Sequence, residues 1–169
     1  MDAKQITSAF DDVFDQALVF HAYTDYMRDY ELVIQASADP VTGIPTEYLR
    51  YLFTQCVQAD VTTALTEEIW SRSTDDRLTD YDTGVDLDGY VWGVKWQALY
   101  PGLSLVDSST AAARWSESLG IPFHEAIAQT NGHNIRLVFS DLRVVKAEPG
   151  YTPFHVDEPF WDGKIPFAR

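Results

Sequence analysis

The stretch that decides the fold is Phe123–Lys146, with the sequence FHEAIAQTNGHNIRLVFSDLRVVK. Two alternating runs, Phe123–Gln129 and Ile135–Lys146, flank a short polar connection. Such alternation of apolar and polar residues is typical of half-buried strands. Asn131-Gly132 between the runs predicts a tight hairpin turn in which both residues take φ > 0. The second run loses its phase near Ser140-Asp141, which predicts a bulge or bend there.

Other segments extend this strand pattern. Tyr30–Ser37 alternates, and Glu47–Thr63 alternates again after residues 39–45, where proline fixes φ and glycine tolerates φ > 0. These two runs predict a second antiparallel hairpin. Tyr90–Ala98 adds a strand that carries Tyr90, Trp92 and Trp96 on one face, which we interpret as a core face rather than a stacking platform for a sugar or base.

Two helices are expected. Apolar residues at helical spacing over Ile6–His21, with acidic residues opposite, predict the first. The second covers Ser109–Leu119, with a serine cap at its start, Trp115 and Leu119 on its buried side and Gly120 in the left-handed conformation at its end. Thr66 is placed to cap a short additional helix, because two glutamates follow it in the first turn.

Together these elements predict an α+β domain. We expect an antiparallel sheet of about five strands built from hairpins, with two helices packed on one face. Residues 1–150 are expected to form this single domain. Residues 151–169, rich in proline and aromatic residues, are expected to be a C-terminal tail packed on the domain or else a binding element.

Composition limits the class of protein. With 169 residues, 46% of them hydrophobic, the chain can bury a real core. The formal net charge of −14 argues against direct nucleic-acid binding, which needs a basic surface. Cys56 is the single cysteine, the N-terminus has no secretory pattern and no apolar run is long enough to cross a membrane. These features predict a soluble cytoplasmic protein without a membrane partner.

An acidic segment is the strongest candidate for contact with a partner. Its carboxylates fit a basic protein, and the aromatic residues that follow supply contact area. The proposed partner-binding residues are Asp75, Asp76, Asp80, Asp82, Asp86, Asp88, Tyr90 and Trp92. A calcium loop starting at Asp80 would need a ligand where Gly84 stands and glycine where Val85 stands. We therefore predict a solvated loop and no metal site.

Catalytic signatures are missing from the sequence. His124-Glu125 begins a zincin-like string, but Ala128 occupies the position of the second histidine and the segment has the pattern of a strand. Cys56 lies in an alternating run, so we expect it to be a small, buried apolar residue. No serine elbow, phosphate loop or dinucleotide fingerprint occurs. We predict no catalytic residue and no cofactor.

Two segments, DLDGYVWGVKWQ at Asp86–Gln97 and LVFSDL at Leu137–Leu142, resemble the YxiG-like family of bacterial proteins. The resemblance extends from the first helix to about Tyr151. It implies no catalytic residues, because the family has no established activity, but the family's namesake lies in a toxin–immunity gene neighbourhood.

Three functions fit these observations. The first is a non-enzymatic acidic binding protein of the immunity or inhibitor type that recognises a basic protein partner. The second is a small-ligand or cation-dependent hydrolytic domain near the aromatic strand, with Asp82, Asp86 or Asp88 as ligands and His124 or His133 as base. The third is an acidic mimic of nucleic acid.

Overall fold

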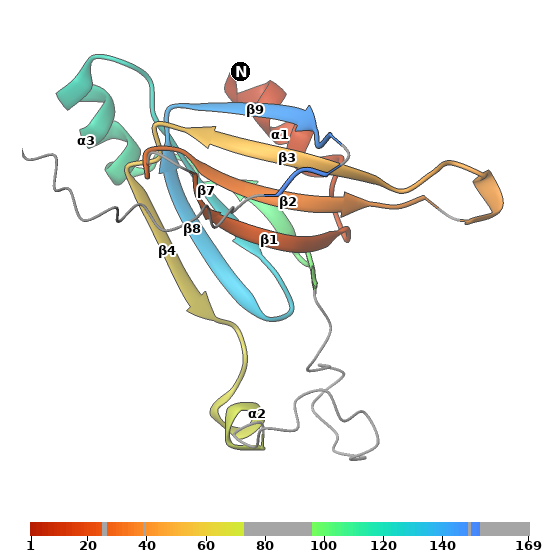
Figure 1. Ribbon diagram of the computed structural model, residues 1–169. Coiled ribbons are helices and arrows are strands. Elements are labelled where there is room, and N and C mark those ends of the chain that lie inside the picture. The colour runs from red at the N-terminus through yellow and green to blue at the C-terminus, as the bar shows by residue number, and fades with distance from the viewer. Residues whose placement is uncertain (25–26, 39, 73–95, 149, 153–169) are drawn as a thin grey trace, which may run out of the picture.

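A computed structural model describes residues 1–24, 27–38, 40–72, 96–148 and 150–152 (Figure 1). Its strands are β1 (Ala17–Tyr23), β2 (Tyr30–Ala36), β3 (Glu47–Thr54), β4 (Gln58–Thr63), β5 (Gln97–Ala98), β6 (Gly102–Leu105), β7 (His124–Gln129), β8 (His133–Phe139) and β9 (Asp141–Lys146). Its α-helices are α1 (Ala3–Asp11), α2 (Glu67–Arg72) and α3 (Thr110–Leu119), and η1 (Pro40–Thr42) is a 3-10 turn.

The strands form two antiparallel sheets. The five-stranded sheet has the order β5-β1-β2-β3-β9, and the four-stranded sheet has the order β4-β8-β7-β6. The predicted α+β class and the five-stranded antiparallel sheet are confirmed. The second sheet was not predicted.

The two predicted hairpins are present, as the β2–β3 and β7–β8 pairs. The predicted turn geometry of the second is wrong, because neither Asn131 nor Gly132 has a positive φ. The hydroxyl of Thr130 fixes this turn instead, accepting hydrogen bonds from the backbone N–H groups of Gly132 (3.1 Å) and His133 (2.7 Å). Asn131 is held from outside the hairpin, since its N–H donates to Ala98 O at 3.1 Å.

Two bends connect the sheets. The run Glu47–Thr63, predicted as one strand, breaks at Gln55, where φ is 50°. The predicted bend near Ser140-Asp141 is confirmed, because β8 ends before Ser140 and β9 begins after it. The Ser140 N–H donates to Thr54 O at 3.0 Å, so the two bends lie side by side. Each run therefore leaves one sheet and enters the other.

The core lies between the two sheets and is completed by α1. The rings of Phe53 and Phe139, from opposite sheets, meet edge to face with centroids 4.8 Å apart. Phe10 of α1 lies 6.3 Å from the Phe53 ring. Each of these three side chains is at most 2% exposed. Burial of large aromatic area supplies much of the stabilising free energy of such a core.

The predicted helix over Ile6–His21 is wrong in its second half, which forms β1. α1 ends at Asp11, and the chain turns at Asp15, where φ is 59°. A β-bulge between Leu18 and Phe20 then shifts the register of β1. It places Leu18 and His21, three residues apart, opposite the core residues Ile34 and Leu32. This spacing imitates one face of a helix.

The predicted helix at Ser109–Leu119 is confirmed as α3. Ser109 caps it by accepting the Ala112 N–H at 3.0 Å, and Gly120 ends it with φ of 67°. Ala112 packs with Val138 on the face of the four-stranded sheet turned away from the core. Leu119 was expected on the buried side of this helix but is 54% exposed, because the helix contacts the sheet through its first turns.

The remaining predictions on elements have mixed outcomes. The short helix after Thr66 is confirmed as α2. Of the strand expected at Tyr90–Ala98, residues 96–98 are described, and Gln97–Ala98 are β5. Residues 73–95 and the tail from 153 lie outside the described residues. In the described ranges no helix is long and apolar enough to cross a membrane.

Candidate functional site

All eight predicted partner-binding residues lie outside the described residues and stay predictions. Trp96, which was predicted to share a core face with Tyr90 and Trp92, is 46% exposed, so that prediction is wrong for this residue. Cys56 is buried as predicted, because it is 5% exposed. Its thiol donates a hydrogen bond to Gln58 O at 3.1 Å. Burial raises the pKa of this thiol to about 11, which makes it a poor nucleophile.

Two of the histidines, His21 and His133, are engaged in structural hydrogen bonds. His21 Nδ1 lies 2.7 Å from the Tyr30 hydroxyl, and His133 Nδ1 lies 2.7 Å from Gln97 Nε2. His124 begins strand β7, so the predicted exclusion of a zincin helix holds. Over the described ranges, no three metal-ligating side chains come together.

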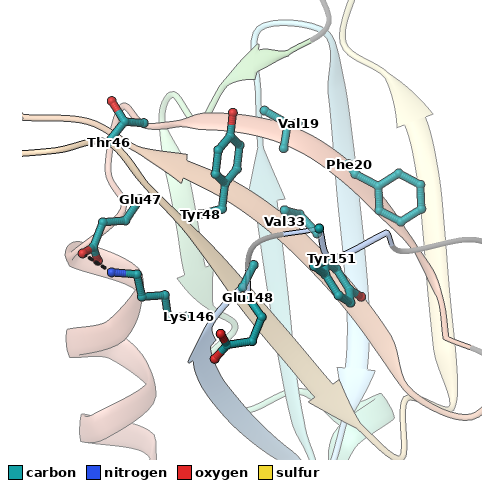
Figure 2. A pocket seen from close by; sticks show the side chains of 11 residues that line it. Val19, Phe20, Val33, Thr46, Glu47, Tyr48, Lys146, Glu148 and Tyr151 are labelled. Carbon is teal, nitrogen blue, oxygen red and sulfur yellow. Dashed lines mark hydrogen bonds and ion pairs between the residues drawn. The ribbon is translucent and has the colours of Figure 1, made fainter.

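A concave site lies on the outer face of the five-stranded sheet, turned away from the core. It is a half-open pocket of about 500 Å³, bounded by β1, β2, β3 and the chain that follows β9 (Figure 2). The described lining residues are Val19, Phe20, Val33, Thr46, Glu47, Tyr48, Lys146, Ala147, Glu148, Gly150 and Tyr151. Its volume is in the range typical of ligand-binding clefts.

The floor of this pocket comes from the β-bulge in β1. Because the bulge falls between Leu18 and Phe20, Val19 is the extra residue and Phe20 is paired with Val33. Val33 lies between two core residues of β2, so its own side chain points to the opposite face, where it is 6% exposed. The bulge therefore gathers Val19, Phe20 and Val33 into one apolar floor.

The wall is the chain that returns over the sheet after β9. Ala147 N–H donates to Tyr48 O at 2.8 Å, which ties the segment to β3. Tyr151 N–H donates to Glu148 O at 2.9 Å across a turn in which Gly150 has φ of 83°. Residues 146–148 and 150–151 thus lead from β9 over β3 to β2, and the pocket lies beneath this segment. We call this segment the returning strap.

A buried polar cluster fastens the returning strap. Glu31 of β2 is only 2% exposed, and its Oε2 accepts hydrogen bonds from Arg50 Nε (3.0 Å) and Nη2 (2.8 Å). The Tyr151 hydroxyl donates to the same carboxylate at 2.7 Å. The Arg50 guanidinium lies 4.1 Å from the Tyr151 ring centroid. Burial and the neighbouring Glu31 carboxylate raise the pKa of Tyr151 to about 12, so the hydroxyl stays a donor.

The rim of the pocket carries charged side chains, and their charges do not cancel. At one end Lys146 Nζ pairs with Glu47 Oε1 at 2.5 Å (Figure 2). The Glu148 side chain is exposed and makes no hydrogen bond or ion pair with another described residue. The described lining residues therefore carry a net charge of −1 above an apolar floor. This combination suits a ligand with an apolar stem and a cationic end.

A second buried carboxylate has a structural role. Glu125 of β7 is 5% exposed and lies beneath the N-terminus of α3, where its Oε2 accepts the hydroxyl hydrogen of Ser109. Its Oε1 lies 3.1 Å from Arg136 Nη1, so the charge is paired although this contact lacks hydrogen-bond geometry. A carboxylate at a helix N-terminus stabilises the helix, because its negative charge interacts favourably with the positive end of the helix dipole. The pocket of about 310 Å³ next to it gains no unpaired charge from Glu125.

The sequence patterns singled out only Tyr151 among the pocket residues, as an aromatic residue of the tail. Two of the three floor residues, Val19 and Phe20, lie inside the wrongly predicted part of the first helix. Leu18-Val19-Phe20 is a run of three apolar residues, and this run was the available signal for a bulge, because a regular half-exposed strand alternates.

The comparisons with known proteins agree with the resemblance noted in the sequence. A family model described as YxiG-like protein matches residues 2–157, which includes every element described above. No curated protein matches the chain.

Proposed function

This chain belongs to the YxiG-like protein family, and we propose that it is a non-enzymatic binding protein of the immunity or inhibitor type, acting on a basic protein partner. The observation that carries the proposal is the pocket under the returning strap. Its apolar floor, its two tyrosines and the Glu148 carboxylate, which has no partner in the part of the chain that the structure describes, are groups used for recognition rather than for bond cleavage.

The charge of the whole chain supports the same proposal. At a formal net charge of −14, the protein attracts cationic surfaces and repels nucleic acids and other acidic proteins. Six of the eight residues predicted to bind the partner, from Asp75 to Asp88, are aspartates that contribute to this charge, and Tyr90 and Trp92 are predicted to add aromatic contact area. We place the protein in the bacterial cytoplasm, where a single buried thiol is stable.

Calorimetry tests this function. The purified chain is titrated with basic proteins encoded beside its gene, at 50 and 300 mM NaCl. We expect one of them to bind with a defined stoichiometry and with an affinity that falls at the higher salt concentration, because salt screens attraction between exposed charges. Glu117→Gln, which removes one exposed charge on α3, is the control and should leave the affinity unchanged.

Replacing Asp80, Asp82, Asp86 and Asp88 together by asparagine tests the acidic segment separately. We expect weaker binding and a smaller salt dependence. Unchanged affinity in this variant would exclude the acidic segment from the interface. An affinity that is the same at both salt concentrations, or an acidic control protein that binds as tightly as the basic one, would contradict the proposed function as a whole.

A further inference from the structure

The pocket under the returning strap has a feature that selects one kind of side chain. Its three apolar floor residues, Val19, Phe20 and Val33, form a surface for an aliphatic stem. Above them, the rim carries Glu148, which has no partner among the described residues, while Glu47 is already paired with Lys146. A cationic side chain would compensate the net negative charge of the rim. A carboxylate would be repelled by Glu148, and Lys146 would not compensate it because it is already paired with Glu47.

We propose that this pocket receives an arginine side chain of the basic partner, with the aliphatic stem on the apolar floor and the guanidinium against Glu148 and the tyrosine rings. Tyr48 and Tyr151 both line the pocket, and Tyr48 is 46% exposed. A guanidinium pairs with a carboxylate and stacks on an aromatic ring in one arrangement, which an ammonium group does less well.

The molecule already uses this chemistry beside the pocket. The Arg50 guanidinium pairs with the Glu31 carboxylate and lies over the Tyr151 ring at 4.1 Å. Tyr151 therefore has its ring fixed by an internal arginine and its hydroxyl fixed by Glu31. A wall residue held in this way loses little conformational entropy when a ligand arrives, which favours binding.

This inference rests on the proposed function, because a basic partner is what supplies the arginine. It is tested without the partner by titrating the ¹⁵N-labelled full chain with N-acetyl-L-arginine methylamide and, separately, with the leucine and glutamate analogues. We expect the arginine probe to shift the backbone amide signals of Val33, Tyr48 and Tyr151, and to bind more tightly than both analogues.

Matched variants identify the charge that selects the probe. Glu148→Gln should weaken arginine binding about threefold, a value within the range of exposed ion pairs, and leave leucine binding unchanged. Glu117→Gln should change neither. The inference is overturned if those amide signals do not move, if leucine or glutamate binds as tightly as arginine, or if Glu148→Gln has no effect.

The calorimetry with basic proteins and the titration with the arginine probe can each give a negative result while the other is positive. A basic protein that binds in calorimetry while the arginine probe leaves the pocket signals unmoved would keep the proposed function and exclude this pocket as the arginine site. Arginine selectivity in the pocket together with no salt-dependent binding of any basic protein would contradict the proposed function instead.

Discussion

Replacing Arg50 by methionine should destabilise the protein, because it leaves the Glu31 carboxylate buried without its cation. Glu31 is 2% exposed and accepts two hydrogen bonds from Arg50 on one oxygen. Methionine keeps much of the apolar volume of the arginine stem, so the variant mainly removes the charge and the donors. The effect measured is therefore that of an uncompensated buried carboxylate.

The magnitude follows from the exposure of the two partners. Removing one member of a buried ion pair costs roughly 3–5 kcal/mol of unfolding free energy. The Arg50 side chain is 26% exposed, and the Tyr151 hydroxyl still donates to Glu31 in the variant, so both features reduce the loss. We expect a loss of about 2–3 kcal/mol. For a domain of this size, that loss lowers the melting temperature by roughly 4–12 °C.

Urea unfolding followed by circular dichroism measures the loss, with Lys146→Met as the control. Lys146 also pairs with a glutamate, but its side chain is 63% exposed, and such pairs contribute about 0–1 kcal/mol. Adding Glu31→Leu to Arg50→Met should recover stability, because no buried charge then remains. If Arg50→Met costs no more than Lys146→Met, or if the double variant is less stable than Arg50→Met, the assigned role of this cluster is wrong.

Three further predictions concern other parts of the domain. Burial lowers the pKa of His21 and His124 below 6.5 in the folded state, so the unfolded chain binds more protons below that pH. The free energy of unfolding should therefore fall as the pH drops from 7.5 through 6.5 towards 5.5, and His21→Gln should flatten this dependence in urea titrations. Cys56 should react with a disulfide reagent at pH 8 about a hundredfold or more slowly in the folded protein than in urea, and equal rates would contradict its burial. Gly132→Ala should cost about 1–2 kcal/mol of unfolding free energy, because its Cβ would lie 2.8 Å from the hydrogen-bonded Gln97 side chain, and adding Gln97→Ser should restore part of that loss.

Elements specified by neighbouring residues were predictable from the sequence. The cap at Ser109 and the left-handed Gly120 define α3 within about a dozen residues. The β2–β3 and β7–β8 hairpins also depend on short-range alternation and a connecting turn. In each case the determining contacts are local, so single-sequence patterns contain the necessary information.

Features that depend on distant contacts were not predictable in this way. The bend at Gln55, which divides the run Glu47–Thr63 between the sheets, is tied to the other bend by the Ser140 N–H, which donates to Thr54 O from far along the sequence. The wall of the pocket depends on Tyr151 and Glu31, which are separated by 120 positions. Alternation continues through the bend at Gln55, so the pattern alone assigned both halves of Glu47–Thr63 to one strand, whereas the loss of phase near Ser140 marked the other bend.

One inserted residue in β1 explains both the helical spacing of Leu18 and His21 and the apolar floor of the candidate site. If β1 alternated regularly from Leu18, Phe20 would point into the core and His21 outward. The bulge reverses this, so that His21 reaches the Tyr30 hydroxyl inside and Phe20 joins Val19 on the outer face. A closed sandwich core needs no apolar pair on its outer face, and bulges commonly re-aim side chains at functional sites. The same irregularity that imitated a helix in the sequence therefore builds the floor of the pocket.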